Sequence, residues 1–222
     1  MNFNVNAVTY VRGAITILAT LAGVSAACAQ ANLLTNGSFE LPVGNGQNQI
    51  IPGGDSTAVL GWTTILSGVE RFDPTLYSVG SAPDGNIVID VCPFNFTGGG
   101  IQQTFATTVG QQYTLSFSAG TSNAFGRTGD AVLNVSVGNV AQSFTLQNLQ
   151  AVAVYNTYTV PFTATAATTL LTFQNLQDAN THFAFIDRVS VPGITAAPEP
   201  GALTFVLATL PLMGAAFRRK RN

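Results

Sequence analysis

Apolar and polar residues alternate along most of the middle of the chain. Across 113–118, Tyr, Leu and Phe occupy the odd positions, and Thr and Ser occupy the even ones. The same alternation recurs at 133–137 and 171–173. Successive side chains of a strand point to opposite faces, so a period of two predicts β-strands with one buried face. Further strands are expected at 61–66, 87–89, 100–106, 142–146, 157–165 and 183–188.

Glycine and asparagine pairs separate these segments, and no helical periodicity lies between them. Examples are Gly98-Gly99-Gly100 and Gly138-Asn139. Short strands at this spacing predict an all-β fold, an antiparallel two-sheet jelly-roll sandwich. A parallel α/β fold is excluded because crossover helices are missing. The longest expected loops are 47–58 and 74–83, and loops on a rigid sandwich are where function concentrates.

The chain opens with the features of an export signal. Arg12 is followed by the apolar run 14–24 and then by small residues up to Ala29. A run of 11 residues is too short for a transmembrane helix, which needs roughly 20. Residues 1–29 are therefore predicted to form a signal helix that signal peptidase removes. Lipid attachment at Cys28 is the alternative, but Ser25 stands where a lipobox usually carries Leu.

The other end combines three features in a fixed order. Pro198-Glu199-Pro200 precedes 17 apolar residues, 201–217, and a basic cluster beginning with Arg218 and Arg219 follows. A hydrophobic helix of this length with a basic end is compatible with a tail anchor. The order also resembles the PEP-CTERM sorting signal of Gram-negative bacteria. This resemblance implies that 198–222 enters the inner membrane transiently and that the membrane protease exosortase removes it.

The intervening segment, 30–197, is one domain in length and is acidic. Its 168 residues contain three arginines, no lysine and nine acidic residues, a formal charge of −6, whereas the whole chain has a charge of −2. Binding to nucleic acid is excluded as a function because it needs a dense set of lysines and arginines. Once 1–29 is removed, Cys92 is the sole cysteine, so neither an intramolecular disulfide nor a cysteine-based metal site is expected.

Two segments at opposite ends of this domain are distinctive. The first is Asn32–Glu40, followed by Gly61-Trp62, and the second is Phe183–Val191. Their order resembles the galactose-binding-like jelly rolls, which include many carbohydrate-binding modules and the DUF642 or "choice-of-anchor" surface proteins of bacteria. From the residues themselves, Asn36-Gly37 predicts a tight turn in which both residues tolerate positive φ. Trp62 is interpreted as a core residue between the sheets, with a sugar-stacking role as the alternative.

Glu40 and Asp187 are the acidic pair of most interest. The first and last strands of a jelly roll often lie side by side, so the two carboxylates are expected to face one cavity. Acids held close together raise each other's pKa unless a cation neutralises them. In the carbohydrate-binding modules that the chain resembles, residues at these positions help to hold a structural calcium, which prefers oxygen ligands. Arg188 stands where a second Asp often follows, so a salt bridge to Glu40, or solvated acids, are the alternatives.

The sequence offers little material for an active site. His182 is the only histidine of the chain, and no G-x-S-x-G motif accompanies it, so a Ser-His-Asp triad is not indicated. Paired carboxylates of the glycosidase type are conceivable among Glu70, Asp73, Asp84 and Asp90. Nothing in the spacing of these four marks a pair. The protein is therefore predicted not to be an enzyme.

These observations favour an exported protein of the cell surface or extracellular matrix that binds or organises extracellular polysaccharide. Sugar sites combine aromatic stacking with hydrogen bonds from amides, hydroxyls and charged groups. The aromatic residues beside expected loops, Tyr77, Phe125 and Tyr155, are the carbohydrate-binding candidates, and the loop 123–127 adds an amide and a guanidinium. The alternatives are a purely structural matrix protein without a glycan site and a glycan-active hydrolase.

Overall fold

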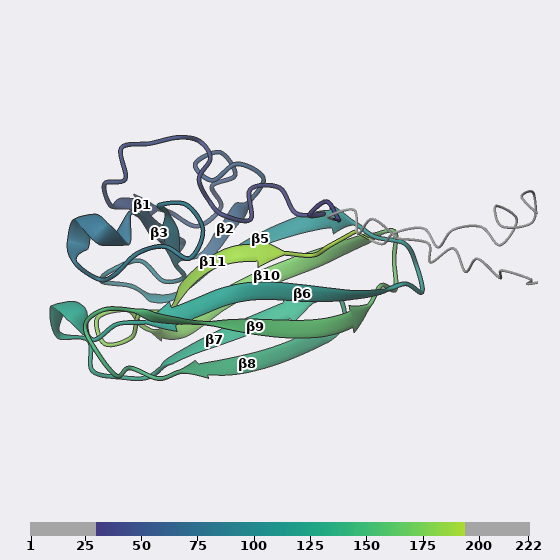
Figure 1. Ribbon diagram of the computed structural model, residues 1–222. Coiled ribbons are helices and arrows are strands. Elements are labelled where there is room, and N and C mark those ends of the chain that lie inside the picture. Colours follow the sequence, from purple (N-terminus) through teal and green to yellow (C-terminus); the bar gives the residue numbers. More distant parts are fainter. Residues whose placement is uncertain (1–29, 194–222) are drawn as a thin grey trace, which may run out of the picture.

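The computed structural model describes residues 30–193, which form a sandwich of two antiparallel sheets (Figure 1). Within this range the helical elements are two short 3-10 helices, η1 (Pro74–Tyr77) and η2 (Ala124–Gly126). None of the helices in 30–193 is long and apolar enough to cross a membrane. The predicted signal helix and C-terminal hydrophobic helix fall in 1–29 and 194–222, outside the described residues. The all-β, antiparallel two-sheet prediction is confirmed for the domain itself.

The part of the chain that the structure describes contains eleven strands, divided between the two sheets. In spatial order, the six-stranded sheet contains β1 (Gln49–Ile51), β3 (Val69–Phe72), β4 (Val88–Asp90), β11 (Phe185–Ser190), β6 (Gln112–Thr121) and β9 (Val154–Thr163). The five-stranded sheet contains β2 (Thr63–Leu66), β5 (Thr97–Ala106), β10 (Thr168–Asp178), β7 (Ala131–Val137) and β8 (Val140–Leu146).

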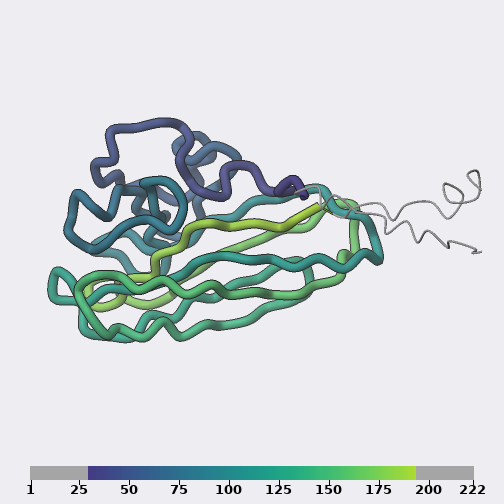
Figure 2. Tube along the Cα trace, viewed as in Figure 1, coloured from purple at the N-terminus to yellow at the C-terminus, as the bar shows by residue number. Residues whose placement is uncertain are grey.

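The chain passes repeatedly from one sheet to the other. From β4 onwards successive strands alternate between the sheets, apart from the β7–β8 hairpin. The ends of the described chain meet, because Asn32 forms an isolated antiparallel bridge with Pro192 and the Leu33 N–H donates to the Val191 carbonyl (2.9 Å). Figure 2 shows these two ends together at one end of the sandwich, while η1 and η2 lie at the other (Figure 1). The predicted proximity of the first and last segments is confirmed.

Two strands of the six-stranded sheet do not follow the predicted pattern. β1 lies inside the segment 47–58 that was expected to be a loop. β3 is buried at all four positions, and its Glu70 and Arg71 are only 4% and 5% exposed. Because both faces of β3 are covered, its sequence carries no apolar–polar alternation, and the segment is not among the predicted strands.

The predicted tight turn at Asn36-Gly37 is present, but each residue is required for a different reason. Asn36 adopts a positive φ of 52°, and its side-chain amide bonds both the N–H and the carbonyl of Leu41. Gly37 does not have a positive φ. Its carbonyl accepts from the Val189 N–H (2.8 Å), and a Cβ at Gly37 would collide with the Val189 carbonyl oxygen. Close approach to β11, rather than conformational freedom, therefore selects this glycine.

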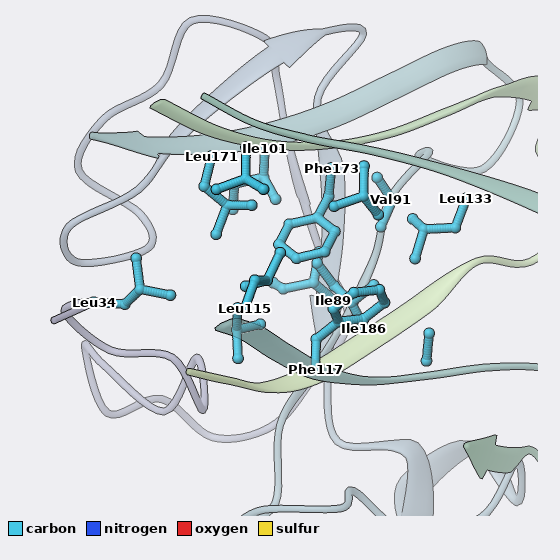
Figure 3. Packing of buried hydrophobic residues seen from close by; sticks show 14 of the residues in the cluster. Leu34, Ile89, Val91, Ile101, Leu115, Phe117, Leu133, Leu171, Phe173 and Ile186 are labelled. Atoms are coloured by element: carbon cyan, nitrogen blue, oxygen red, sulfur yellow. The ribbon is translucent and has the colours of Figure 1, made fainter. Parts of the chain in front are cut away.

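The main core lies between the two sheets and is rich in aromatic side chains. Figure 3 shows Ile101, Leu133, Leu171 and Phe173 pointing from one layer towards residues such as Phe117 of the other. Trp62 is 1% exposed, packs against the rings of Phe39 and Phe173, and donates its indole N–H to the carbonyls of Thr35 and Asn36. The interpretation of Trp62 as a core residue is confirmed.

A second apolar cluster covers part of the outer face of the six-stranded sheet. Alternation from Phe183 into the start of β11 explains it: Ala184 and Ile186 belong to the main core, whereas Phe183 and Phe185 belong to the second cluster. Phe72 and Val88 join Phe183 and Phe185 in this cluster. Covering loops then bury the outer side chains that a solvated sheet would expose, and this packing creates the candidate site.

Candidate functional site

A cleft of about 310 Å³ opens over the second apolar cluster. It lies at the end of the sandwich where η1 and η2 are found (Figure 1). Its lining is mostly apolar and aromatic, with three polar residues, and comes from segments far apart in the sequence: Asn48, Ile50, Glu70, Phe72, Tyr77, Val79, Phe94, Phe125, Arg127, Phe183 and Phe185. A largely apolar cleft with a few polar groups is the usual form of a small-molecule site.

Two of the predicted carbohydrate-binding residues, Tyr77 and Phe125, line this one cleft. Phe125 is 63% exposed and sits at a positive φ of 55° within η2, which holds its ring out at the rim. Tyr77 packs edge-on against Phe72, with ring centroids 5.5 Å apart, and its hydroxyl accepts a hydrogen bond from the Asn48 backbone N–H (2.8 Å). The cleft therefore has one projecting ring and one ring fixed by its neighbours.

Local sequence explains why Tyr77 is held in place. The Asp73 side chain caps the start of η1 by accepting from the Thr75 N–H (2.8 Å), and Pro74 occupies the first helical position. Ser78 ends η1 in the left-handed conformation, and its N–H bonds back into the turn. Such capping fixes short helices that would not persist by themselves.

The third candidate, Tyr155, lies beneath the cleft rather than in its lining. Its ring passes over Gly120 of the neighbouring strand, where a Cβ would approach Tyr155 Cδ1 to 3.1 Å. Tyr155 packs against the second apolar cluster, and its buried hydroxyl has no hydrogen-bond partner within 30–193. Burial raises the pKa of Tyr155 above its ordinary value, with the charges of Asp187 and Asp90 adding to the effect. Its position is that of a supporting residue.

Arg127 is the positively charged group of the cleft. It is 5% exposed, and its guanidinium carbon lies 3.8 Å from the ring centroid of Phe183 and 4.9 Å from that of Phe94. Its Nε donates to the Ala179 carbonyl (3.2 Å) and its Nη1 to the Phe125 carbonyl (3.4 Å). Burial lowers the pKa of Arg127, and nearby acids oppose that shift, so the guanidinium remains charged. Stacked between rings, it is held rigidly beside the cleft.

Glu70 and Asp90 form a buried acidic pair next to Arg127. They are directly opposite each other on β3 and β4. Glu70 accepts from the Phe94 N–H (2.6 Å) and from the Asn48 side-chain amide (3.3 Å). Asp90 has no exposed surface, and its Oδ2 has no partner within 30–193. Burial, reinforced by the Glu70 charge, raises the pKa of Asp90 well above its ordinary value.

This pair does not have the arrangement that glycoside hydrolysis requires. A general acid must contact the bond that it protonates. Glu70 lines the cleft, but Asp90 is fully buried and is not part of the lining. In this conformation Asp90 affects the cleft through Glu70 and Arg127 rather than by touching a ligand.

Glu40 and Asp187 form a separate acidic site around the segment 84–87. Asp187 accepts from the N–H groups of Arg188 (2.6 Å) and Asp84 (2.7 Å), and Glu40 Oε1 accepts from those of Asn86 (2.9 Å) and Ile87 (2.7 Å). Burial raises the pKa of Asp187 to about 7, and the charges of Asp84 and Glu40 contribute. The two predicted metal-site residues therefore do converge on one loop.

The arginine that contacts Glu40 is Arg71, not Arg188 as in the salt-bridge alternative. The Arg188 side chain is exposed, while its backbone takes a positive φ of 51° where the β11–β6 register shifts. Arg71 instead donates from Nη2 to the Glu40 carbonyl (3.0 Å), and the Glu40 charge partly offsets the lowering of the Arg71 pKa by burial.

Carboxylate oxygens are suitable calcium ligands, and Glu40 Oε2 and the Asp84 carboxylate are free to bind a calcium ion. Against this, no group of three or more His, Cys, Asp or Glu side chains within 30–193 is arranged to hold a metal ion. Three carboxylate oxygens already accept backbone N–H groups. The calcium site stays a prediction.

Comparison with known protein families shows which family the chain belongs to. Residues 32–192 match the family described as "Protein of unknown function (DUF642)". The chain belongs to the DUF642 family. The match covers almost all of the described sandwich, from the bridge at Asn32 to its partner Pro192. A search of curated proteins found no match.

Several solved structures are distantly similar to this DUF642 protein. TmCBM61, solved in complex with beta-1,4-galactotriose, is 12% identical with a TM-score of 0.48, over 72% of this chain and 97% of that one. A CBM4 structure is 17% identical with a TM-score of 0.41, over 72% and 98%. Arabinose-bound MgGH51 a-L-arabinofuranosidase is 12% identical with a TM-score of 0.45, over 74% and 26%. At these sequence identities and TM-scores, neither the ligands nor the reactions of these proteins can be assigned to the DUF642 protein.

The sequence analysis named only part of the DUF642 cleft. It identified Tyr77 and Phe125, and it noted the amide and guanidinium of the loop that contains Arg127. It missed Phe94 and Phe183, which hold that guanidinium. The available signal was the segment 183–186, in which Phe183 and Phe185 repeat at a spacing of two on the side opposite Ala184 and Ile186.

Proposed function

We propose that this DUF642 protein binds extracellular polysaccharide, without altering it chemically, in the cleft lined by Tyr77 and Phe125. The observation that carries the proposal is the Phe125 ring, 63% exposed at the rim and beside a buried guanidinium. An exposed ring offers a flat apolar surface to the C–H face of a sugar.

The polar groups of the cleft complement this surface. Asn48, Glu70 and Arg127 are spread along its lining. The hydrogen bonds of Arg127 within 30–193 use Nε and Nη1, so Nη2 is available to a hydroxyl of the ligand. A few fixed polar groups on an apolar cleft orient a ligand and select its hydroxyl pattern. The buried position of Asp90 supports binding rather than hydrolysis as the role of the cleft.

The same proposal includes export and display at the cell surface or in the extracellular matrix of a Gram-negative bacterium. Its support is the sequence of 1–29 and 198–222, with signal peptidase and exosortase as the processing partners. The position of the cleft agrees with display: the described chain ends lie at one end of the sandwich, and η1 and η2 lie at the other (Figure 2). A protein held through its C-terminal segment would present the cleft outwards.

The proposal is tested by titrating the purified protein with galactan, hydroxyethyl cellulose and polygalacturonate. Phe125→Ala and Tyr77→Ala should each weaken binding several-fold, because one stacking ring is worth about 1 kcal/mol. Phe96→Ala is the matched control, since Phe96 is 46% exposed but does not line the cleft. Melting curves establish that each variant is folded.

Three results would count against the proposal. Absence of binding at millimolar saccharide units would replace it with a purely structural role in the matrix. Equal losses for Phe125→Ala and Phe96→Ala would place the binding surface elsewhere. Release of reducing ends that depends on Glu70 would make the protein a hydrolase.

A further inference from the structure

Two rows of residues that pair from strand to strand cross the outer face of the five-stranded sheet, and neither row contains a charged residue. One row runs through Ser143, Asn134, Gln174, Gly100 and Ile65, and the next through Ala141, Ser136, Thr172, Gln102 and Thr63. All ten positions are uncharged. The surface of a soluble domain usually mixes both signs of charge. Here the buried and half-buried carboxylates of Glu40, Glu70, Asp90 and Asp187 belong to the opposite side of the sandwich.

A shallow hollow of about 220 Å³ lies on this face. Its polar lining is supplied by Asn134, Ser136, Gln142, Ser143 and Gln174. The Ser143 hydroxyl donates to Asn134 Oδ1 (2.7 Å), and no hydrogen bond within 30–193 uses the side-chain N–H groups of Asn134. Among the hydrogen bonds of residues 30–193, the side chains of Ser136, Gln142 and Gln174 take no part, so their donors and acceptors are open to a ligand.

The chemistry of the hollow selects its ligand. Primary amides and hydroxyls both donate and accept, as sugar hydroxyls do. No cation in the two rows attracts a carboxylate or sulfate, and the domain as a whole has an excess of six negative charges that repels an acidic polymer. An uncharged polysaccharide meets none of that repulsion.

We propose that the hollow is a second binding site, specific for a neutral polysaccharide chain. It rests on the proposed function of the cleft and extends it, because the two sites occupy the outer faces of different sheets. A single molecule then holds two polysaccharide segments on opposite sides and links them. Linking of chains, rather than tight binding of one, is the expected consequence of two such sites.

Light scattering of mixtures with galactan tests this proposal, using the full-length protein. Wild type should increase scattering, with a maximum at an intermediate ratio of protein to polymer. Ser143→Glu, which places a charge in the hollow, should abolish the increase, and Phe125→Ala, which weakens cleft binding several-fold, should reduce it. Both variants should still bind the polymer. The double variant should bind several-fold more weakly than either single variant. Thr145→Glu, on the same face and strand but outside the hollow, should behave as wild type.

The outcomes separate the two proposals. Complete loss of binding in Phe125→Ala would leave the cleft as the single site and overturn the hollow. Unchanged scattering in Ser143→Glu, or equal effects of Ser143→Glu and Thr145→Glu, would also overturn it. Absence of wild-type binding to galactan and hydroxyethyl cellulose would overturn the hollow, and absence of binding to polygalacturonate as well would overturn both. Full binding in Phe125→Ala together with none in Ser143→Glu would overturn the cleft and retain the hollow. Melting curves confirm that the variants are folded.

Discussion

At the scale of single residues, the outer face of the six-stranded sheet contains buried carboxyl groups. Burial raises the pKa of Asp90 and of Asp187 above the ordinary value. Burial disfavours the charged form of an acid, and neighbouring acids add to that cost. Such groups make the stability of the domain depend on pH in a direction that can be stated in advance.

Asp187 should make the domain less stable as pH rises from about 4 to about 7. The native state keeps the proton of Asp187 up to a pKa of about 7, whereas the unfolded chain releases it near 3.8, so the native state binds more protons in that window. Asp187→Asn cannot ionise and should flatten this part of the profile when unfolding is measured in the presence of a chelator. Asp178→Asn, an exposed acid at the end of β10, is the control. A profile for Asp187→Asn identical to wild type would contradict the burial argument.

If calcium binds Glu40 and Asp187, added calcium should raise the melting temperature, and more at pH 8 than at pH 5. A ligand that binds only the native state stabilises it by mass action, and protonation of Asp187 competes with the ion. Glu40→Ala and Asp187→Ala should each remove the response to calcium and to chelator. Identical wild-type melting curves with calcium and with chelator would eliminate the calcium site.

At the scale of elements, the domain is closed by contacts between its first and last segments. The turn at Asn36-Gly37 packs against β11, and the bridge at Asn32 extends the contact to Pro192. β11 and the two residues before it contribute Ala184 and Ile186 to the main core and Phe183 and Phe185 to the cleft lining. One strand thus joins the stability of the fold to the shape of the candidate site.

Gly37→Ala should therefore destabilise the domain by about 2 kcal/mol, because a Cβ at this position collides with the backbone of Val189 and forces the turn away from β11. Gly193→Ala is the matched control, since its nearest contacts would be at ordinary van der Waals distance, 3.5 Å. Chemical denaturation of the two variants provides the measurement. Equal stabilities would show that the turn adapts without cost.

At the scale of the whole molecule, processing at both ends should leave the sandwich intact. The segments 1–29 and 198–222 have the features of processing signals, and 30–193 contains the complete set of sheet pairings described above. The intact mass of the exported protein should correspond to a chain that starts at Gln30 or Asn32 and ends near Pro198. Deleting 201–222 should leave the protein folded but misrouted. Recovery of the full-length chain from the inner membrane would instead support a tail anchor.

The sequence by itself determined the class of fold and most of the strands, because alternation of apolar and polar residues is a short-range property of a half-buried strand. It also identified Trp62 as a core residue and predicted that the first and last segments lie side by side. It could not reveal β3, since both faces of that strand are covered, or the packing of Phe94 and Phe183 around Arg127. Only the tertiary structure decided that Tyr77 and Phe125, 48 positions apart, line one cleft while Tyr155 lies beneath it. The physical reason is that a cleft depends on long-range pairing of strands and on which loops cover the outer face, and neither leaves a periodic signal in the local sequence.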